Sequence, residues 1–260
     1  MPEAGPKKYV PRVGGPSQTT NINEVETPRV WYGKSVVADL YPEDEWLVVA
    51  DSHMSKRHAT RYSRGMGAGV VAIKGGRLEI TARLLEKLGY LRDQIKCFFL
   101  LTSGNDLTNV NATVQEITGE YMKLVSNILE WNPKSIVITG TPILRAPDRR
   151  TPVESADWYQ DRVGELDNSM WQADDKRHHH FVTDFLSADR GLKGTGIRDI
   201  LYENDLTHLN EEGFAQYTQV LEFVFKSVNC DDFGGRQRLN IGQWDEFMTN
   251  GRWRSVLWKF

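Results

Sequence analysis

The chain has little cysteine, no long apolar run and no excess of charge of one sign. Cys97 and Cys230 are the only cysteines in 260 residues, so no disulfide framework is expected. No apolar run reaches the roughly 18 residues of a membrane-spanning helix, and residues 1–8 lack the apolar stretch of a secretory signal. The net charge of −3 gives no global reason to expect a nucleic-acid or anionic-membrane partner. These features predict a soluble, intracellular, cytoplasmic protein without a transmembrane anchor, and they equally fit a piece of a longer polyprotein.

The composition predicts one α/β domain with an extension at each end. With 40% hydrophobic residues, the chain can bury one sizeable core. Residues 1–44 are rich in Pro, Gly, Thr and Asn without clear periodicity, which is typical of a flexible arm. We therefore expect the domain over residues 45–228 and an aromatic and basic extension over residues 229–260.

Apolar runs alternate with helical patterns along this domain. Strands are predicted at residues 46–50, 69–74, 97–101, 135–140 and 180–184, and helices at residues 78–91, 114–131, 156–172 and 211–226. Short strands separated by helices, without hairpin turns, favour parallel pairing. Runs such as residues 97–101 are apolar throughout, as in strands covered on both faces. The predicted fold class is α/β: a three-layer α/β/α sandwich around a mainly parallel five-stranded sheet, of the flavodoxin-like kind.

Polar residues and glycines follow the first three predicted strands. Asp51 and Ser52 follow the first strand, Gly75 and Gly76 the second, and Asn105 the third. Because the ligand crevice of an open parallel sheet lies at the carboxyl ends of its strands, these residues should meet at one edge. Taken singly, an Asp-Ser pair is more typical of a helix cap, and an Asn-Asp pair of a turn. Their order and common position at strand ends favour a functional site.

A serine, a histidine and an aspartate supply the parts of a nucleophilic site. The Ser52 hydroxyl is a weak nucleophile near neutral pH and needs a base to take its proton. His208 suits that task because imidazole is the side chain that titrates nearest to neutral pH. Asp205 can accept the proton of the other ring nitrogen and hold the imidazole in the useful tautomer. A histidine alone is more often a surface residue, so the combination is what predicts catalysis.

The motifs resemble those of the SGNH/GDSL hydrolase superfamily of esterases, lipases and related deacylases. The likeness extends from Glu45 to Val228, and its blocks are Ala50-Asp51-Ser52, Ser103-Gly104-Asn105-Asp106 and Asp205-Leu206-Thr207-His208, in the family's order and at comparable spacings. The resemblance implies that Ser52 is the nucleophile, His208 the base and Asp205 its orienting partner. It also implies an oxyanion hole formed by the backbone N–H of Ser52, the backbone N–H of a second-block glycine and the side chain of Asn105.

Glycines matter at several of these positions. Gly76 is our choice for the second-block glycine over Gly75 and Gly69, because it opens a helix whose free N–H and dipole would point at an anion. Two other family glycines are replaced, by Ala50 and Ser103. Ala50 is tolerable if its φ is negative, whereas a β-carbon at Ser103 would strain the turn that presents the oxyanion-hole asparagine.

The resemblance predicts a serine esterase or deacylase that hydrolyses a small acyl ester, such as an acetyl ester, through an acyl-serine intermediate. An O-acyltransferase would use the same residues. The non-enzyme alternative is a catalytically weak scaffold that binds nucleic acid or a protein partner through the C-terminal extension. The Asp-Ser-His form of the first block resembles SGNH-like domains encoded by some mobile elements, which favours this alternative. The extension's aromatic and basic residues are Trp244, Phe247, Arg252, Trp253, Arg254, Trp258, Lys259 and Phe260, and we favour their docking onto the domain or a partner chain.

Three further features receive weaker interpretations. The run His178-His179-His180 suggests a metal site, but consecutive residues entering a strand point to opposite faces and do not converge on one ion. We therefore expect neither a metal nor a cofactor. The loop at residues 145–150 is expected to be solvated, although its charges would suit an anionic substrate. His53 would either shape the entrance to the site or serve in the first turn of a helix.

Overall fold

The structure is a computed structural model of the whole chain. It describes residues 36–39, 44–55, 59, 61–62, 65–89, 93–146, 154–183 and 199–227. The expected C-terminal extension and most of the expected N-terminal arm lie outside these ranges, so both stay predictions. Among the described helices, none is both long enough and apolar enough to cross a membrane.

Within the described ranges, six strands form a single sheet in the order β1-β3-β2-β4-β5-β6. They are β1 (Val36–Asp39), β2 (Trp46–Ala50), β3 (Gly69–Ile73), β4 (Cys97–Leu101), β5 (Ile136–Gly140) and β6 (His178–Phe181). The five strands from β2 to β6 run parallel, as predicted, and β1 adds an antiparallel edge next to β3. The flexible arm predicted for residues 1–44 is therefore wrong for residues 36–39. A four-residue edge strand gains its order from pairing with β3, which its own short pattern does not reveal.

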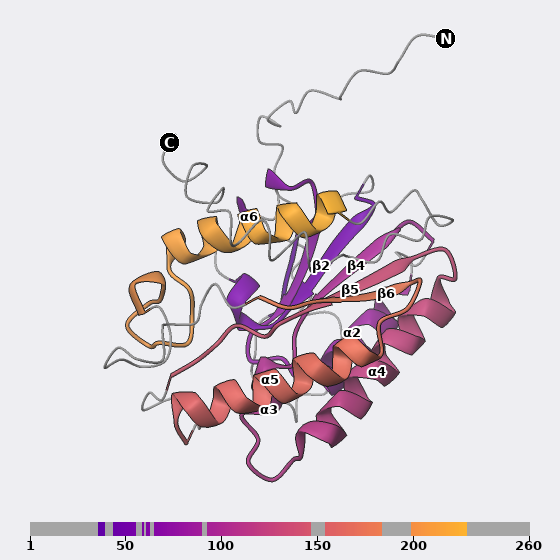
Figure 1. Cartoon of the computed structure of the whole chain (residues 1–260). Helices are drawn as coiled ribbons and strands as arrows, with labels where there is room; N and C mark the ends of the chain where they lie inside the picture. Colours follow the sequence, from indigo (N-terminus) through magenta and orange to yellow (C-terminus); the bar gives the residue numbers. More distant parts are fainter. Residues whose placement is uncertain are drawn as a thin grey trace.

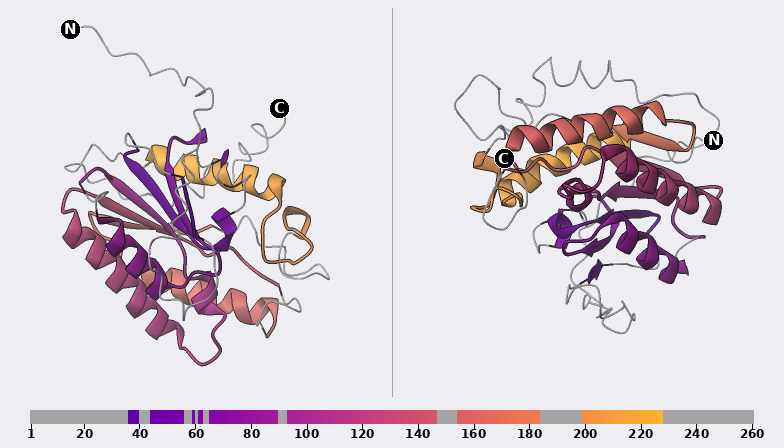
Figure 2. Two further views of the ribbon diagram at one scale, coloured as in Figure 1. Left: turned by 180° about the vertical axis from the view of Figure 1, so that it is seen from behind. Right: turned by 90° about the horizontal axis from the view of Figure 1, so that it is seen from below.

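Helices cover both faces of the sheet. The long ones are α2 (Leu78–Lys87), α4 (Val114–Trp131), α5 (Ala156–Gln172) and α6 (Glu211–Ser227), and the short ones are η3 (Ser52–Ser55), α3 (Gly104–Leu107) and η5 (Asp199–Leu201). Figures 1 and 2 show α6 on one side of the sheet and α2, α4 and α5 on the other. The predicted three-layer sandwich is confirmed.

Local caps explain why two of the predicted helices begin where they do. The Thr113 hydroxyl accepts the N–H of Glu116, whose carboxylate accepts the N–H of Thr113, so α4 begins with a capping box. The Ser155 hydroxyl accepts the N–H of Trp158 at the start of α5. Strand β6, in contrast, covers residues 178–181 rather than the predicted 180–184, because its pairing with β5 runs from His178 beside Val137 to Phe181 beside Gly140.

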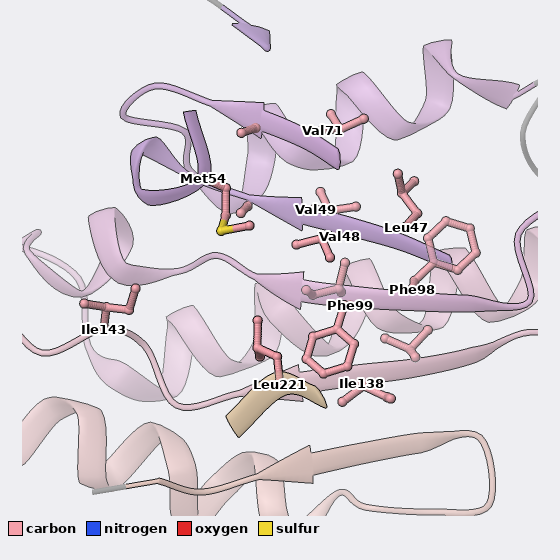
Figure 3. Packing of buried hydrophobic residues seen from close by; sticks show 14 of the residues in the cluster. Leu47, Val48, Val49, Met54, Val71, Phe98, Phe99, Ile138, Ile143 and Leu221 are labelled. Carbon is pink, nitrogen blue, oxygen red and sulfur yellow. The ribbon is translucent and has the colours of Figure 1, made fainter. Parts of the chain in front are cut away.

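The sheet forms the centre of the core. Val48, Val49 and Phe99 are fully buried within it. Figure 3 shows Leu221 of α6 beside Phe99 and Ile138, so α6 covers the central strands on that face of the sheet. A closely packed sheet of this kind is rigid, so it fixes the positions of the loops at the carboxyl ends of its strands relative to one another.

Candidate active site

The structure brings the predicted nucleophile, base and orienting aspartate together. The Ser52 Oγ lies 2.9 Å from Nε2 of His208, although the two residues are 156 positions apart in the chain. On the other side of the ring, Nδ1 of His208 lies 2.6 Å from Oδ2 of Asp205. Ser52 begins η3 at the end of β2, whereas Asp205 and His208 lie in the loop before α6. The arrangement is that of a nucleophile, a base and an orienting group.

A tight turn presents His208 to the serine. The Oδ1 of Asp205 accepts the backbone N–H groups of Thr207 at 3.0 Å and of His208 at 2.9 Å. Leu206 adopts a left-handed conformation with φ of 49° so that the chain can reverse between them. The aspartate therefore holds both the backbone and the ring of the base.

The charge of Asp205 suits its position. Burial alone would raise its pKa, but hydrogen bonds from the backbone N–H and ring of His208 and from the Thr207 N–H outweigh burial and leave the pKa lowered. Asp205 is therefore an anion near neutral pH and accepts the Nδ1 hydrogen of His208. The Nε2 lone pair then faces the Ser52 hydroxyl, which is the tautomer a general base needs.

Asn105 lies at the same edge of the sheet, near the start of α3. Its Nδ2 donates to the carbonyl oxygen of Gly76 at 2.8 Å, and its Oδ1 accepts from Nη1 of Arg145 at 3.0 Å. An amide nitrogen carries two hydrogens, so Asn105 has a second one to offer to an anion after the bond to Gly76 is made.

Gly76 does not open a helix with a free N–H, so the two features predicted to make it an oxyanion donor are wrong. Its N–H donates to the carbonyl oxygen of Ile73 at 2.8 Å, and α2 begins two positions later, at Leu78. The N–H of Leu78 in turn donates to Asp106. This hydrogen bond closes the turn between β3 and α2 and occupies the N–H of Gly76. The donor role of Gly76 therefore stays a prediction, and it requires the bond to Ile73 to open. A glycine is still needed there, because a β-carbon would lie 2.8 Å from Cβ of Ile73.

The two glycine replacements differ in their consequences. Ser103 has φ of 82° and ψ of −18°, the left-handed conformation that favours glycine, so the strained turn predicted there is confirmed. Ser103 and Leu206 are the non-glycine residues with positive φ in the described ranges, so Ala50 meets its condition of a negative φ. The Ser103 carbonyl accepts the N–H groups of Asp106 and Leu107, and this one-turn helix fixes Asn105 despite the strain.

Arg145 and Asp51 form a buried ion pair that was not predicted from the sequence. Arg145 is 2% exposed, and its Nη2 lies 3.1 Å from Oδ2 of Asp51, which is equally buried. The expected solvated loop at residues 145–150 is therefore wrong for Arg145 and Ala146, and residues 147–150 lie outside the described ranges. No local signal marks this arginine, because its counter-charge comes from 94 positions away.

His53 is buried beside the base. Its ring centroid lies 5.2 Å from that of His208, and its N–H donates to Oδ1 of Asp51 at 3.0 Å. It occupies the first turn of η3, as one of its two predicted roles requires. Its proposed part in shaping the entrance stays a prediction.

The histidine run in β6 alternates as predicted. His178 and His180 both contact Thr139 Oγ1, whereas the ring of His179 contacts Asp174 instead. Across the described ranges, no group of three His, Cys, Asp or Glu side chains is arranged to hold a metal ion.

Comparisons with known proteins agree on the fold. No family model matches the chain, and no curated protein matches its sequence. Similar solved structures include a protein from Bacteroides fragilis named as an acylhydrolase (14% identity, TM-score 0.57, 72% of this chain and 88% of that one). A GDSL-like lipase from Bacteroides thetaiotaomicron has a TM-score of 0.57 at 13% identity, over 71% of this chain and 88% of that one. A protein from Streptococcus pneumonia named as a platelet activating factor has a TM-score of 0.54 at 14% identity, over 70% and 84%. The chain has the SGNH/GDSL hydrolase fold.

Proposed function

We propose that the chain is a serine hydrolase of the SGNH type that cleaves small acyl esters through an acyl-serine intermediate. The observation that carries the proposal is the Ser52–His208–Asp205 relay, with distances of 2.9 and 2.6 Å, at the carboxyl edge of a parallel sheet. The motif blocks of the sequence and the fold of the similar structures, whose names include acylhydrolase and lipase, support it.

The reaction follows from the relay. The Ser52 oxygen attacks the ester carbonyl carbon while its proton passes to Nε2 of His208, and the carbonyl oxygen becomes an oxyanion. The second amide hydrogen of Asn105 and the backbone N–H of Ser52 are the donors we assign to that charge. The intermediate collapses when the imidazolium returns its proton to the leaving alkoxide, which departs as the alcohol. Water then attacks the acyl-serine with His208 as base, and the acid and free Ser52 are released.

A small cavity lies next to the segment that carries the nucleophile. It has a volume of about 10 Å³, close to the size that holds a single water, and is lined by Asp51 and His53, which flank Ser52, together with Met54 and Ile143. Ser52 and His208 are not among its lining residues, so the small acyl group of the proposal rests on the motif resemblance and not on this cavity. An alcohol in place of water at the second step would make the same residues an O-acyltransferase.

Active-serine labelling tests the proposal. The purified chain should react with a fluorophosphonate probe and turn over p-nitrophenyl acetate, and both should be lost in Ser52→Ala and in His208→Ala. Ser169→Ala and His179→Ala are the matched controls, because these residues lie on α5 and β6, away from the relay. A folded wild type that neither labels nor turns over the ester would overturn the proposal and favour the scaffold alternative.

A further inference from the structure

Arg145 bridges two segments of the proposed active site. One guanidinium nitrogen, Nη1, donates to Oδ1 of Asn105 at 3.0 Å, and the other, Nη2, donates to Oδ2 of Asp51 at 3.1 Å. Asp51 directly precedes the nucleophile and also accepts the N–H of His53. The planar fork of an arginine holds two acceptors at a fixed separation, which a lysine cannot do.

The bond to Asn105 fixes which way its amide faces. A guanidinium only donates, so the group that it contacts must be the amide oxygen and not the nitrogen. The amide nitrogen then points toward the carbonyl of Gly76 and away from Arg145. A flipped amide would put a donor against the guanidinium and an oxygen against Gly76, and it would offer no second N–H to an oxyanion.

The same loop also holds the base. The N–H of Ala146 donates to the carbonyl oxygen of Leu206 at 3.1 Å, within the turn between Asp205 and His208. The Tyr202 hydroxyl donates to the carbonyl oxygen of Leu144 at 2.8 Å. Residues 144–146 therefore contact the nucleophile segment, the Asn105 segment and the base loop.

The absence of a side chain at Gly104 leaves space for the Arg145 guanidinium. A β-carbon at Gly104 would lie 2.5 Å from Nη2 of Arg145 and 3.3 Å from Oδ2 of Asp51. The residue immediately before Asn105 thus leaves room for the guanidinium to sit between Asn105 and Asp51. The aromatic ring of Tyr159 lies 5.8 Å from the guanidinium carbon and supports it from another side.

We propose that Arg145 is a positioning residue, which orients the Asn105 amide toward the oxyanion and ties it to the nucleophile segment through Asp51. This inference rests on the proposed esterase function. Arg145 acts through Asn105, so its removal should slow the chemical step and leave substrate binding nearly unchanged.

A double-mutant cycle tests the proposal with p-nitrophenyl acetate as substrate. Asn105→Ala should lower kcat by about 10²–10³-fold, the usual effect of losing one oxyanion donor. Arg145→Lys, which keeps a charge beside Asp51, should lower kcat by about tenfold or more at similar KM. In the Asn105→Ala background, Arg145→Lys should have no further effect, because the amide it orients is gone. Independent, multiplying losses would overturn the proposal.

Arg177→Lys is the matched control. Arg177 donates to the backbone carbonyls of Leu129 and Pro133 and directly precedes β6, at the end of the sheet opposite to the site, so its replacement tests the general effect of losing an arginine that ties segments together. An Arg177→Lys loss of kcat as large as that of Arg145→Lys would indicate a merely structural effect and would overturn the assignment.

A measurement that needs no activity separates this inference from the proposed function. In ¹⁵N spectra of the wild type, the side-chain amide of Asn105 should give two well-separated, slowly exchanging hydrogens, which collapse toward free-amide values in Arg145→Lys. An unchanged Asn105 amide in that variant would overturn the positioning role whether or not the wild type hydrolyses esters. An inactive wild type with the expected amide response would overturn only the esterase.

Discussion

The described part of the chain contains two relays of an aspartate, a histidine and a hydroxyl, one at the carboxyl edge of the sheet and one in the core. In the edge relay, His208 lies 2.9 Å from Ser52 Oγ and 2.6 Å from Asp205. In the core relay, Nδ1 of His180 lies 2.8 Å from Thr139 Oγ1, and its Nε2 lies 2.9 Å from Asp167. The distances alone do not tell the two apart.

Exposure to solvent distinguishes the two relays. The His208 side chain is 20% exposed, whereas that of His180 is fully buried, as is Thr139. The Thr139 hydroxyl is also shared with His178, and burial lowers the pKa of His178 to about 4, so that ring is neutral near pH 7. The Thr139 hydroxyl is buried between the two rings, so a substrate cannot reach it. The core relay joins β5, β6 and α5, whereas the base of the edge relay is partly exposed.

Replacement of the Ser52 and Thr139 hydroxyls should give the largest difference in activity between the two relays. Ser52→Ala should lower kcat/KM for p-nitrophenyl acetate by about 10⁴-fold or more, because the nucleophile is lost. Thr139→Val keeps the shape of the side chain and should leave kcat/KM unchanged. Comparable losses in both variants would contradict the assignment of catalysis to the edge relay.

Amide substitution of the two aspartates should separate activity from stability. Asp205→Asn should lower kcat by about 10²–10⁴-fold because the imidazole loses its tautomer control, with little effect on urea unfolding. Asp167→Asn should preserve kcat but lower the free energy of unfolding by about 1–3 kcal/mol, because the donors of Thr141 and His180 lose a charged acceptor. The reverse pattern would mean that the two relays have been assigned the wrong roles.

Asp106, near the edge relay, and His178, in the core relay, should change the free energy of unfolding in opposite directions as pH falls. Burial raises the pKa of Asp106 to about 7, so its contribution to stability is present below pH 4 and is lost as pH rises to 7. Burial of His178 favours its neutral ring and lowers its pKa to about 4. Its contribution to stability is therefore present above pH 6.5 and is lost as pH falls to 4. Relative to wild type, Asp106→Asn should lose stability between pH 7 and 4, and His178→Gln should gain it, each on the order of 3 kcal/mol by urea unfolding. Parallel curves for all three proteins would contradict both shifts.

The smallest effect is expected at the strained turn beside Asn105. Ser103→Gly removes an unfavourable left-handed serine and a buried hydroxyl, but it adds chain entropy to the unfolded state. The free energy of unfolding should rise by about 1 kcal/mol, and kcat should stay level or increase. A clear fall in both would show that the serine side chain has a role which the described contacts do not explain.

Much of the fold was predictable because its signals are local. Strands β2 and β4 are continuous apolar runs, and α4 combines a regular apolar face with a capping box, so their limits agree with the prediction. Strand β1 could not be predicted, because its order comes from pairing with Val70–Ile73 in β3. The three residues of the proposed catalytic relay were predicted from the motif order, and the structure brings them within hydrogen-bonding distance.

The missed features depend on partners far away in the chain. An arginine in a loop rich in proline and charge indicates a solvated surface until Asp51 is known to lie beside it. The N–H of Gly76 looked free until the turn to Ile73 was known. Both errors concern how a polar group is satisfied, which depends on the folded surroundings rather than on the residue itself.

The left-handed leucine between Asp205 and His208 has a consequence for heat inactivation. A leucine in this conformation costs roughly 1–2 kcal/mol, and the turn is held by the N–H of Ala146 and by the carboxylate of Asp205. As temperature rises, this turn should relax before the core of the sheet melts. Ester hydrolysis should therefore fail several degrees below the midpoint of global unfolding and return on cooling, as a reversible loss of the base from an otherwise folded protein.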